Sequence, residues 1–98
     1  GVPVSEIQEG IKNGVRKINI DTDLRLASTA AIRKHCNEDP AQFDPRKYLL
    51  KSKNAMKVIV KQRLVEFGTA GNASKIKPIS LSEMSKHYSN GQLSQIIG

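Results

Sequence analysis

The sequence predicts an α/β fold, and in particular one piece of a larger α/β protein. A helical pattern precedes a β-branched, alternating run at 15–20, and a second helical pattern follows it. No second stretch of the sequence has a comparable strand pattern. Because the backbone groups of a lone strand need neighbours, we expect its partner strands to lie elsewhere, in a parallel sheet or barrel.

The first helix is predicted over about residues 5–13. Ser5 and Gln8 have the spacing of a capping box, and Asn13 with Gly14 is a typical helix stop. We therefore expect Ser5 to cap this helix.

The strand and its helix come next. Ile18 and Ile20 share one face of the run at 15–20. Thr22 or Asp23 can then cap a helix that extends to about residue 36.

A connection and a longer helix complete the middle of the chain. Pro45 disfavours helix in the residue before it, which predicts a connection over about 37–45. Apolar positions from 48 to 67 then fall on one helical face, and Gly68 is well placed to end that helix.

The last predicted helix covers about residues 80–89. Ser80 and Glu83 form a second capping box at its start. The pattern at 92–98 predicts no particular element.

Composition bounds the possible functions. The 98 residues carry 16 Lys and Arg against 9 Asp and Glu, a net charge of +7, and residues 50–98 alone carry +6. An anionic partner is therefore expected, and nucleic acid, a phosphorylated metabolite and an acidic protein all qualify. No apolar run reaches the roughly 18 to 20 residues of a membrane span, and no secretory signal pattern is present. These features predict a cytoplasmic protein that contacts no membrane.

Polar residues gather where the predicted strand ends and the next helix begins. Asn19 and Asp21 project from one side of the strand, and the free backbone N–H groups of Thr22 and Asp23 could hold a phosphate. Asp21 would repel that phosphate, so its carboxylate suits substrate hydroxyls or the orientation of neighbours. Arg25, one helical turn later, suits the anion.

A plain structural role for these residues also stays open. Thr22 or Asp23 can be an ordinary helix cap, because Asx and Thr caps are common. Asn19 can equally be a strand-end residue with satisfied hydrogen bonds. Spacing alone does not choose between the two interpretations.

Other candidate sites are weaker. His35 and Cys36 are adjacent and point about 100° apart on a helix, and His87 is distant in sequence, so a zinc site within this chain is not expected. A lysine stripe at 53, 57 and 61 predicts either a solvated helix face or a nucleic-acid surface, but stacking aromatics are scarce. Arg46 gains nothing from the helix dipole at a helix start, which indicates a partner for it.

Four segments of the chain match a known family: Gly1-Val2-Pro3-Val4, 14–23, 43–48 and 67–76. The Asn-Ile-Asp-Thr-Asp run at 19–23 is the most specific of these. On these motifs the chain closely resembles the C-terminal portion of class II, metal-dependent fructose-1,6-bisphosphate aldolases.

The resemblance implies a C-terminal fragment of a (β/α)8 TIM barrel. Residues 1–38 would hold the last barrel strand and helix with the preceding helix, and residues 39–98 a helical extension with a subunit contact. The activity implied is reversible cleavage of fructose 1,6-bisphosphate to dihydroxyacetone phosphate and glyceraldehyde 3-phosphate, in glycolysis, gluconeogenesis or the Calvin cycle.

The same resemblance assigns roles to five residues. Asn19 would contact the dihydroxyacetone portion of the substrate, Asp21 and Thr22 would hold its phosphate, and Arg25 would meet the other phosphate. Arg46 would reach that second phosphate from the neighbouring subunit of a homodimer or higher oligomer.

The resemblance places the metal centre outside this chain. The family's three histidine ligands to a divalent metal, normally zinc, and its catalytic aspartate precede the matched region. We therefore expect no catalytic or metal-binding residue here, and no activity from these 98 residues without the remainder of the aldolase. The rival hypothesis is a basic helical module that binds nucleic acid or an acidic protein.

Overall fold

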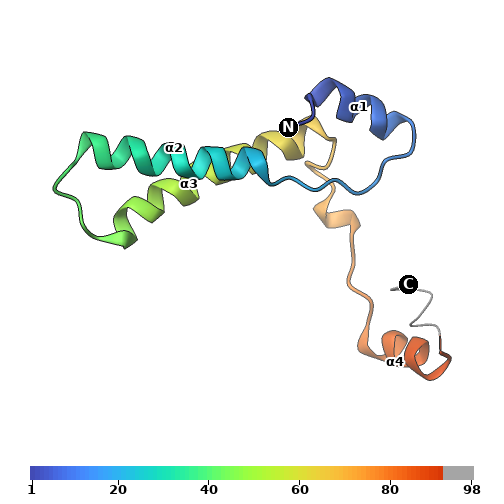
Figure 1. Cartoon of the computed structure of the whole chain (residues 1–98). Coiled ribbons are helices and arrows are strands. Elements are labelled where there is room, and N and C mark those ends of the chain that lie inside the picture. The colour runs from blue at the N-terminus through green and yellow to red at the C-terminus, as the bar shows by residue number, and fades with distance from the viewer. Residues whose placement is uncertain (92–98) are drawn as a thin grey trace.

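The computed structural model describes residues 1–91, which form an extended, mainly helical molecule (Figure 1). The order of elements is α1 (Val4–Lys12), α2 (Thr22–Glu38), α3 (Pro45–Glu66), a short 3-10 helix η1 (Ala73–Lys75) and α4 (Leu81–Ser89). The radius of gyration is 19.6 Å, against about 13 Å for a compact domain of 100 residues. The chain is therefore not packed around a core of its own.

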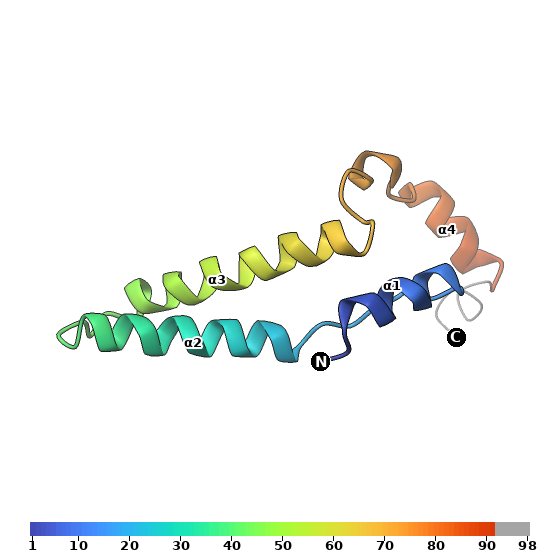
Figure 2. The ribbon, with the colours of Figure 1, turned by 90° about the horizontal axis from the view of Figure 1, so that it is seen from above.

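An antiparallel hairpin of α2 and α3 is the main tertiary feature. The two helices lie side by side in both views, with the connection at one end (Figures 1 and 2). Ser52 of α3 is 4% exposed and is the one buried residue among those described. No apolar side chain between residues 1 and 91 is buried, and large ones such as Leu26, Leu49 and Val58 are exposed. Much of the hairpin's apolar surface is thus uncovered.

Local chemistry sets both ends of α3, although the helix begins at Pro45, three residues before the predicted start at 48. The Asp44 side chain accepts a hydrogen bond from the Arg46 amide, and Pro45 takes the first helical position, where its missing N–H costs nothing. Gly68 has φ +74°, and the amides of Gly68 and Thr69 donate to the carbonyls of Val65 and Leu64. This is a Schellman ending, and it confirms the predicted role of Gly68.

The capping box of α4 is also confirmed. The Ser80 hydroxyl accepts from the Glu83 amide, and the Glu83 carboxylate accepts from the Ser80 amide. α4 lies apart from the hairpin (Figure 1). The pattern at 92–98 lies outside the described residues, and no helix within 1–91 is long and apolar enough to cross a bilayer.

The segment at 15–20, predicted as a strand with partners elsewhere in the protein, has no partner strand within the described residues. The segment is extended but belongs to no sheet, and none of residues 1–91 forms a strand. The Val15 amide donates to the Gly10 carbonyl, whereas the amides of 16–20 have no backbone acceptor within the described part of the chain. The physical reason is that a strand is defined by its neighbours, and none is present.

The predicted N-terminal caps of α1 and α2 are wrong. Pro3, not Ser5, precedes the first residue of α1, and no side chain caps it. Thr22 is the first residue of α2, and Asp21 occupies the N-cap position without capping through its side chain. The helices themselves form as predicted, because their apolar periodicity does not depend on the cap.

Candidate functional site

A pocket of about 330 Å³ lies at the start of α2. It is half open to solvent and lies between the chain's first residues, α1, the extended segment and the end of α3. Three of the five predicted site residues line it, namely Asn19, Asp21 and Thr22. Its other lining residues are Gly1, Val2, Ile7, Ile18, Ile20, Asp23, Arg63 and Phe67.

The first turn of α2, of which Thr22 and Asp23 line this pocket, has unpaired backbone amides. The Arg25 amide already donates to the Asp21 carbonyl, so the amides of Thr22, Asp23 and Leu24 precede the helical hydrogen-bond pattern. Within residues 1–91 no side chain caps them. Unpaired amides and the positive end of a 17-residue helix dipole together favour an anion.

Two polar side chains at the site are held by basic neighbours. Arg25 Nε donates to Asp21 Oδ1 at 2.8 Å, and Lys17 Nζ donates to Asn19 Oδ1 at 3.0 Å. The Arg25 charge offsets that of Asp21, which reduces the repulsion an anion would meet. Arg25 is not among the residues that line the pocket. Its charge affects the pocket through the ion pair with Asp21, which does line it.

Arg46 lies far from the other four predicted residues. It sits at the start of α3, at the opposite end of the hairpin from Thr22 (Figure 1). The 17 residues of α2 span about 25 Å at 1.5 Å per residue. The Arg46 side chain is 89% exposed and its Nη2 lies 2.8 Å from Asp44 Oδ2. One copy of the chain therefore does not bring Arg46 to the pocket.

Arg63 is a residue of the pocket that the sequence did not single out as a site residue. Its Nη2 lies 3.2 Å from Asp23 Oδ2 and its Nη1 lies 2.6 Å from Glu66 Oε2. The hydrogen bond to Glu66, followed by that to Asp23, raises the pKa of Arg63 above its ordinary value. Asp23 is 40 residues away in sequence, and no local spacing links it to Arg63.

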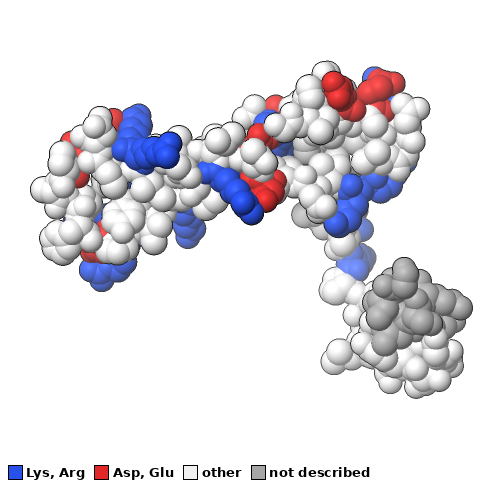
Figure 3. Space-filling view, in the orientation of Figure 1, with Lys and Arg blue, Asp and Glu red and all other residues white. Residues whose placement is uncertain are grey.

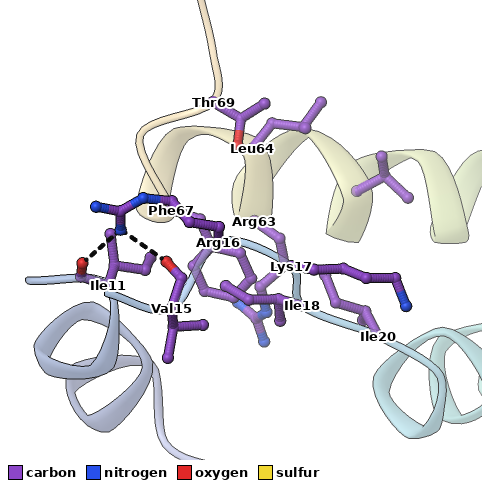
Figure 4. Close-up of a pocket in the computed structure, with 11 residues that line it drawn as sticks. Ile11, Val15, Arg16, Lys17, Ile18, Ile20, Arg63, Leu64, Phe67 and Thr69 are labelled. Carbon is purple, nitrogen blue, oxygen red and sulfur yellow. Dashed lines mark hydrogen bonds between the residues drawn. The ribbon is translucent and has the colours of Figure 1, made fainter. Parts of the chain in front are cut away.

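A second, more apolar pocket of about 460 Å³ lies beside α1 (Figure 4). Ile11, Ile18, Leu64 and Phe67 are among the residues that line it. Arg16 is held at its wall, where Nη1 donates to the carbonyls of Ile11 and Val15, both at 3.0 Å (Figure 4). Its lining suits apolar side chains better than a sugar phosphate.

Metal-binding groups are not clustered in the described chain. Between residues 1 and 91, no three His, Cys, Asp or Glu side chains lie close enough to hold a metal ion. Cys36 is exposed, and His35 Nε2 is buried with no hydrogen-bond partner in that part of the chain.

Basic side chains on the visible face are scattered. Figure 3 shows Lys and Arg in separate groups along the molecule, with acidic side chains between them. The stripe at Lys53, Lys57 and Lys61 is exposed, as a solvated helix face would be. This face offers no single basic track for a nucleic acid.

Comparison with known proteins identifies the family. The family model described as fructose-bisphosphate aldolase class-II matches residues 1–72. The chain belongs to the class II fructose-bisphosphate aldolase family. The matched range of this class II aldolase chain includes the pocket, the run at 19–23, Arg25 and Arg46.

Curated relatives carry the same family name and extend the similarity. The fructose-bisphosphate aldolase of Pseudomonas aeruginosa is 63% identical over 93 residues, which is 95% of this chain and 26% of that protein. Those of Nostoc commune and Xanthobacter flavus are 55% and 52% identical over 96 and 97 residues, covering 98% and 99% of this chain and 27% of each relative. The class II aldolase chain thus spans about a quarter of the length of the curated relatives it matches.

Proposed function

We propose that this chain is the C-terminal part of a cytoplasmic class II aldolase that reversibly cleaves fructose 1,6-bisphosphate to dihydroxyacetone phosphate and glyceraldehyde 3-phosphate. The chain's own contribution is to bind substrate phosphate. The supporting observation is the pocket at the uncapped start of α2, lined by Asn19, Asp21 and Thr22 in a chain of this family.

Different residues of the pocket bind different groups of the substrate. The amides of Thr22 and Asp23 and the hydroxyl of Thr22 donate to the phosphate oxygens. Asn19 donates to a substrate oxygen near the carbonyl. Asp21 carries a negative charge beside Arg25, and its carboxylate accepts from substrate hydroxyls rather than from the phosphate.

The extended segment at 15–20 is, in this proposal, the last strand of a complete (β/α)8 barrel. Its alternating side chains and its unpaired amides support this role, because both edges are open to neighbouring strands. Residues 1–38 then complete the barrel, and residues 39–98 form an extension with a subunit contact. Ligands of (β/α)8 barrels bind at the C-terminal ends of the strands, where Asn19 to Thr22 would lie.

The divalent metal of the family, zinc in this proposal, is held by residues outside this chain. It supplies Lewis-acid stabilisation of the negative charge that develops on the substrate when the carbon–carbon bond breaks. In this proposal the described residues bind and orient the substrate for that chemistry.

Arg46 acts in trans in this proposal. An exposed guanidinium at the far end of an extended hairpin can reach into a neighbouring subunit, and a phosphate there would replace its pairing with Asp44. The active form is therefore a homodimer or a higher oligomer.

The test uses the full-length protein and fructose 1,6-bisphosphate. Asn19→Ala and Asp21→Ala are each expected to lower kcat/KM by at least about tenfold, with the protein still folded. Asp39→Ala is the matched control, because Asp39 is an exposed carboxylate at the other end of α2. Unchanged kcat/KM in both pocket variants, or no cleavage by the intact wild-type protein, would overturn the proposal.

A further inference from the structure

An ion pair joins the two helices beside the candidate site. Arg63 lies in the last turn of α3 and Asp23 in the first turn of α2, and their side chains meet at 3.2 Å between Nη2 and Oδ2. Both residues line the pocket that holds Asn19, Asp21 and Thr22.

Both members of the pair are placed where the helix dipoles favour them. Asp23 is an anion at the positive start of α2, and Arg63 is a cation at the negative end of α3. The Arg63 side chain is only 17% exposed, so the pair is screened less than the surface pairs of this chain. The Arg63–Asp23 ion pair therefore links the first turn of α2 to the last turn of α3.

The local charge argues against direct phosphate binding by Arg63. Its guanidinium already faces two carboxylates, Asp23 and Glu66, which leave the trio with a net charge of −1. A substrate phosphate brought to this trio would meet more negative than positive charge. Any effect of Arg63 on the substrate is thus exerted through Asp23.

The segment before α2 has little else to fix it. The amides of 16–20 make no backbone hydrogen bonds within residues 1–91, and α2 starts without a side-chain cap. Side-chain contacts therefore help to set the position of the segment at 19–22. Arg63 contacts Asp23, the residue that directly follows this segment.

We propose that Arg63 is a positioning residue for substrate binding, which holds Asp23 and so fixes the first turn of α2 at the phosphate pocket. This inference rests on the proposed function. It adds a residue of α3 to the polar residues at 19–22 that the proposed function uses. Arg63 orders the first turn of α2 equally in the substrate complex and in the transition state. Its loss therefore weakens both by the same amount, which raises KM more than it lowers kcat.

The experiment measures steady-state kinetics of the full-length enzyme with fructose 1,6-bisphosphate. Arg63→Gln is expected to raise KM about tenfold, with kcat changed by no more than about twofold. Arg63→Lys keeps the charge and recovers part of the lost affinity, while Arg33→Gln, an exposed arginine of α2, leaves KM unchanged. If Arg63→Gln yields no folded enzyme, Arg63→Lys alone is expected to raise KM, by less than tenfold.

Two further variants separate positioning from simple stability. Asp23→Asn is expected to raise KM as Arg63→Gln does, and the double variant is expected to raise it no further. Glu66→Gln breaks the other ion pair of Arg63, and it is expected to lower the melting temperature without raising KM. An equal rise of KM in Glu66→Gln, an additive double variant, or an unchanged KM in both Arg63 variants would overturn the inference.

The two proposals fail in different ways. If Asn19→Ala and Asp21→Ala impair cleavage while the Arg63 variants do not, the proposed function stands and only the role of Arg63 is lost. If the Asn19 and Asp21 variants cleave normally, the binding site itself is wrong.

Discussion

Ser28 Oγ and Ser52 Oγ lie 2.5 Å apart across the α2–α3 interface. Ser52 is the one residue among 1–91 that is buried, so the most buried point of the described residues is a polar contact between two small side chains. Small residues allow two helices to approach, and the hydroxyl pair satisfies both groups where water is excluded. The hairpin is therefore joined by a hydrogen bond near its middle and an ion pair at its open end.

Enlarging Ser52 is expected to separate the helices. Ser52→Leu should destabilise the full-length protein by about 1–3 kcal/mol through overpacking, and Ser52→Ala by about 1 kcal/mol through the unpaired Ser28 hydroxyl. Thermal or urea unfolding measures both changes. Ser5→Ala, at an exposed serine that caps no helix, is the control and should be neutral. A neutral Ser52→Leu would contradict the packing at this position.

Asp44 is expected to titrate below its ordinary value of 3.8. The side-chain hydrogen bond from Arg46, then that from the Arg46 amide, lowers the pKa of this carboxyl. A lowered pKa in the folded state stabilises the fold above pH 3.8, and this contribution is lost as the pH falls through the pKa of the folded protein. NMR titration of the Asp44 carboxyl carbon measures it.

The matched variants for Asp44 are its two basic neighbours. Arg46→Ala should return the pKa of Asp44 toward its ordinary value. Lys47→Ala should change it less, because Lys47 acts only through its charge and has the smallest effect among the causes of the shift. Equal titration curves in wild type and Arg46→Ala would contradict the ion pair.

Mixed oligomers test whether Arg46 acts in trans. A protomer with Asp21→Ala and a protomer with Arg46→Ala are each expected to be nearly inactive as homodimers. In a mixed dimer one of the two sites holds both native residues, so random mixing should restore about a quarter of wild-type activity. Activity that stays at the level of the two parents after subunit exchange, or a fully active Arg46→Ala homodimer, would contradict a role for Arg46 in trans.

The Schellman ending of α3 predicts a cost for any side chain at position 68. Gly68 has φ +74°, so Gly68→Ala should destabilise the full-length protein by about 1–2 kcal/mol. Gly68→Asn should cost less, because Asn tolerates the left-handed conformation better. Denaturant unfolding compares the two, and equal stability of Gly68→Ala and wild type would show that this turn is not maintained in the whole protein.

Local chemistry explains which elements could be predicted. The glycine at the end of α3 and the Ser80 box act within one turn, so the sequence suffices to place them. The apolar pattern puts the start of α3 at 48, three residues late, because Asp44 and Pro45 begin the helix ahead of that pattern. The predicted strand needed partners from elsewhere in the protein, and without them the segment at 15–20 stays extended and unpaired. The Ser5 cap failed because Pro3 precedes a helix that starts one residue earlier than predicted.

The candidate site divides in the same way. Asn19, Asp21 and Thr22 fall within a run of four residues, so a motif could identify them, and all three line the pocket. Their assigned roles stay predictions. Arg63 reaches the pocket from 40 residues away, and nothing in its local sequence distinguishes it from the other basic residues of the same helix.

The sequence by itself determined the family, the helices and the polar turn at the start of α2, because each depends on residues close together in the chain. Only the tertiary structure decided that α3 returns antiparallel to α2, that Arg63 meets Asp23, and that Arg46 lies at the opposite end of the hairpin. These are distances between residues far apart in sequence. They follow from how two helices pack, which no local pattern encodes.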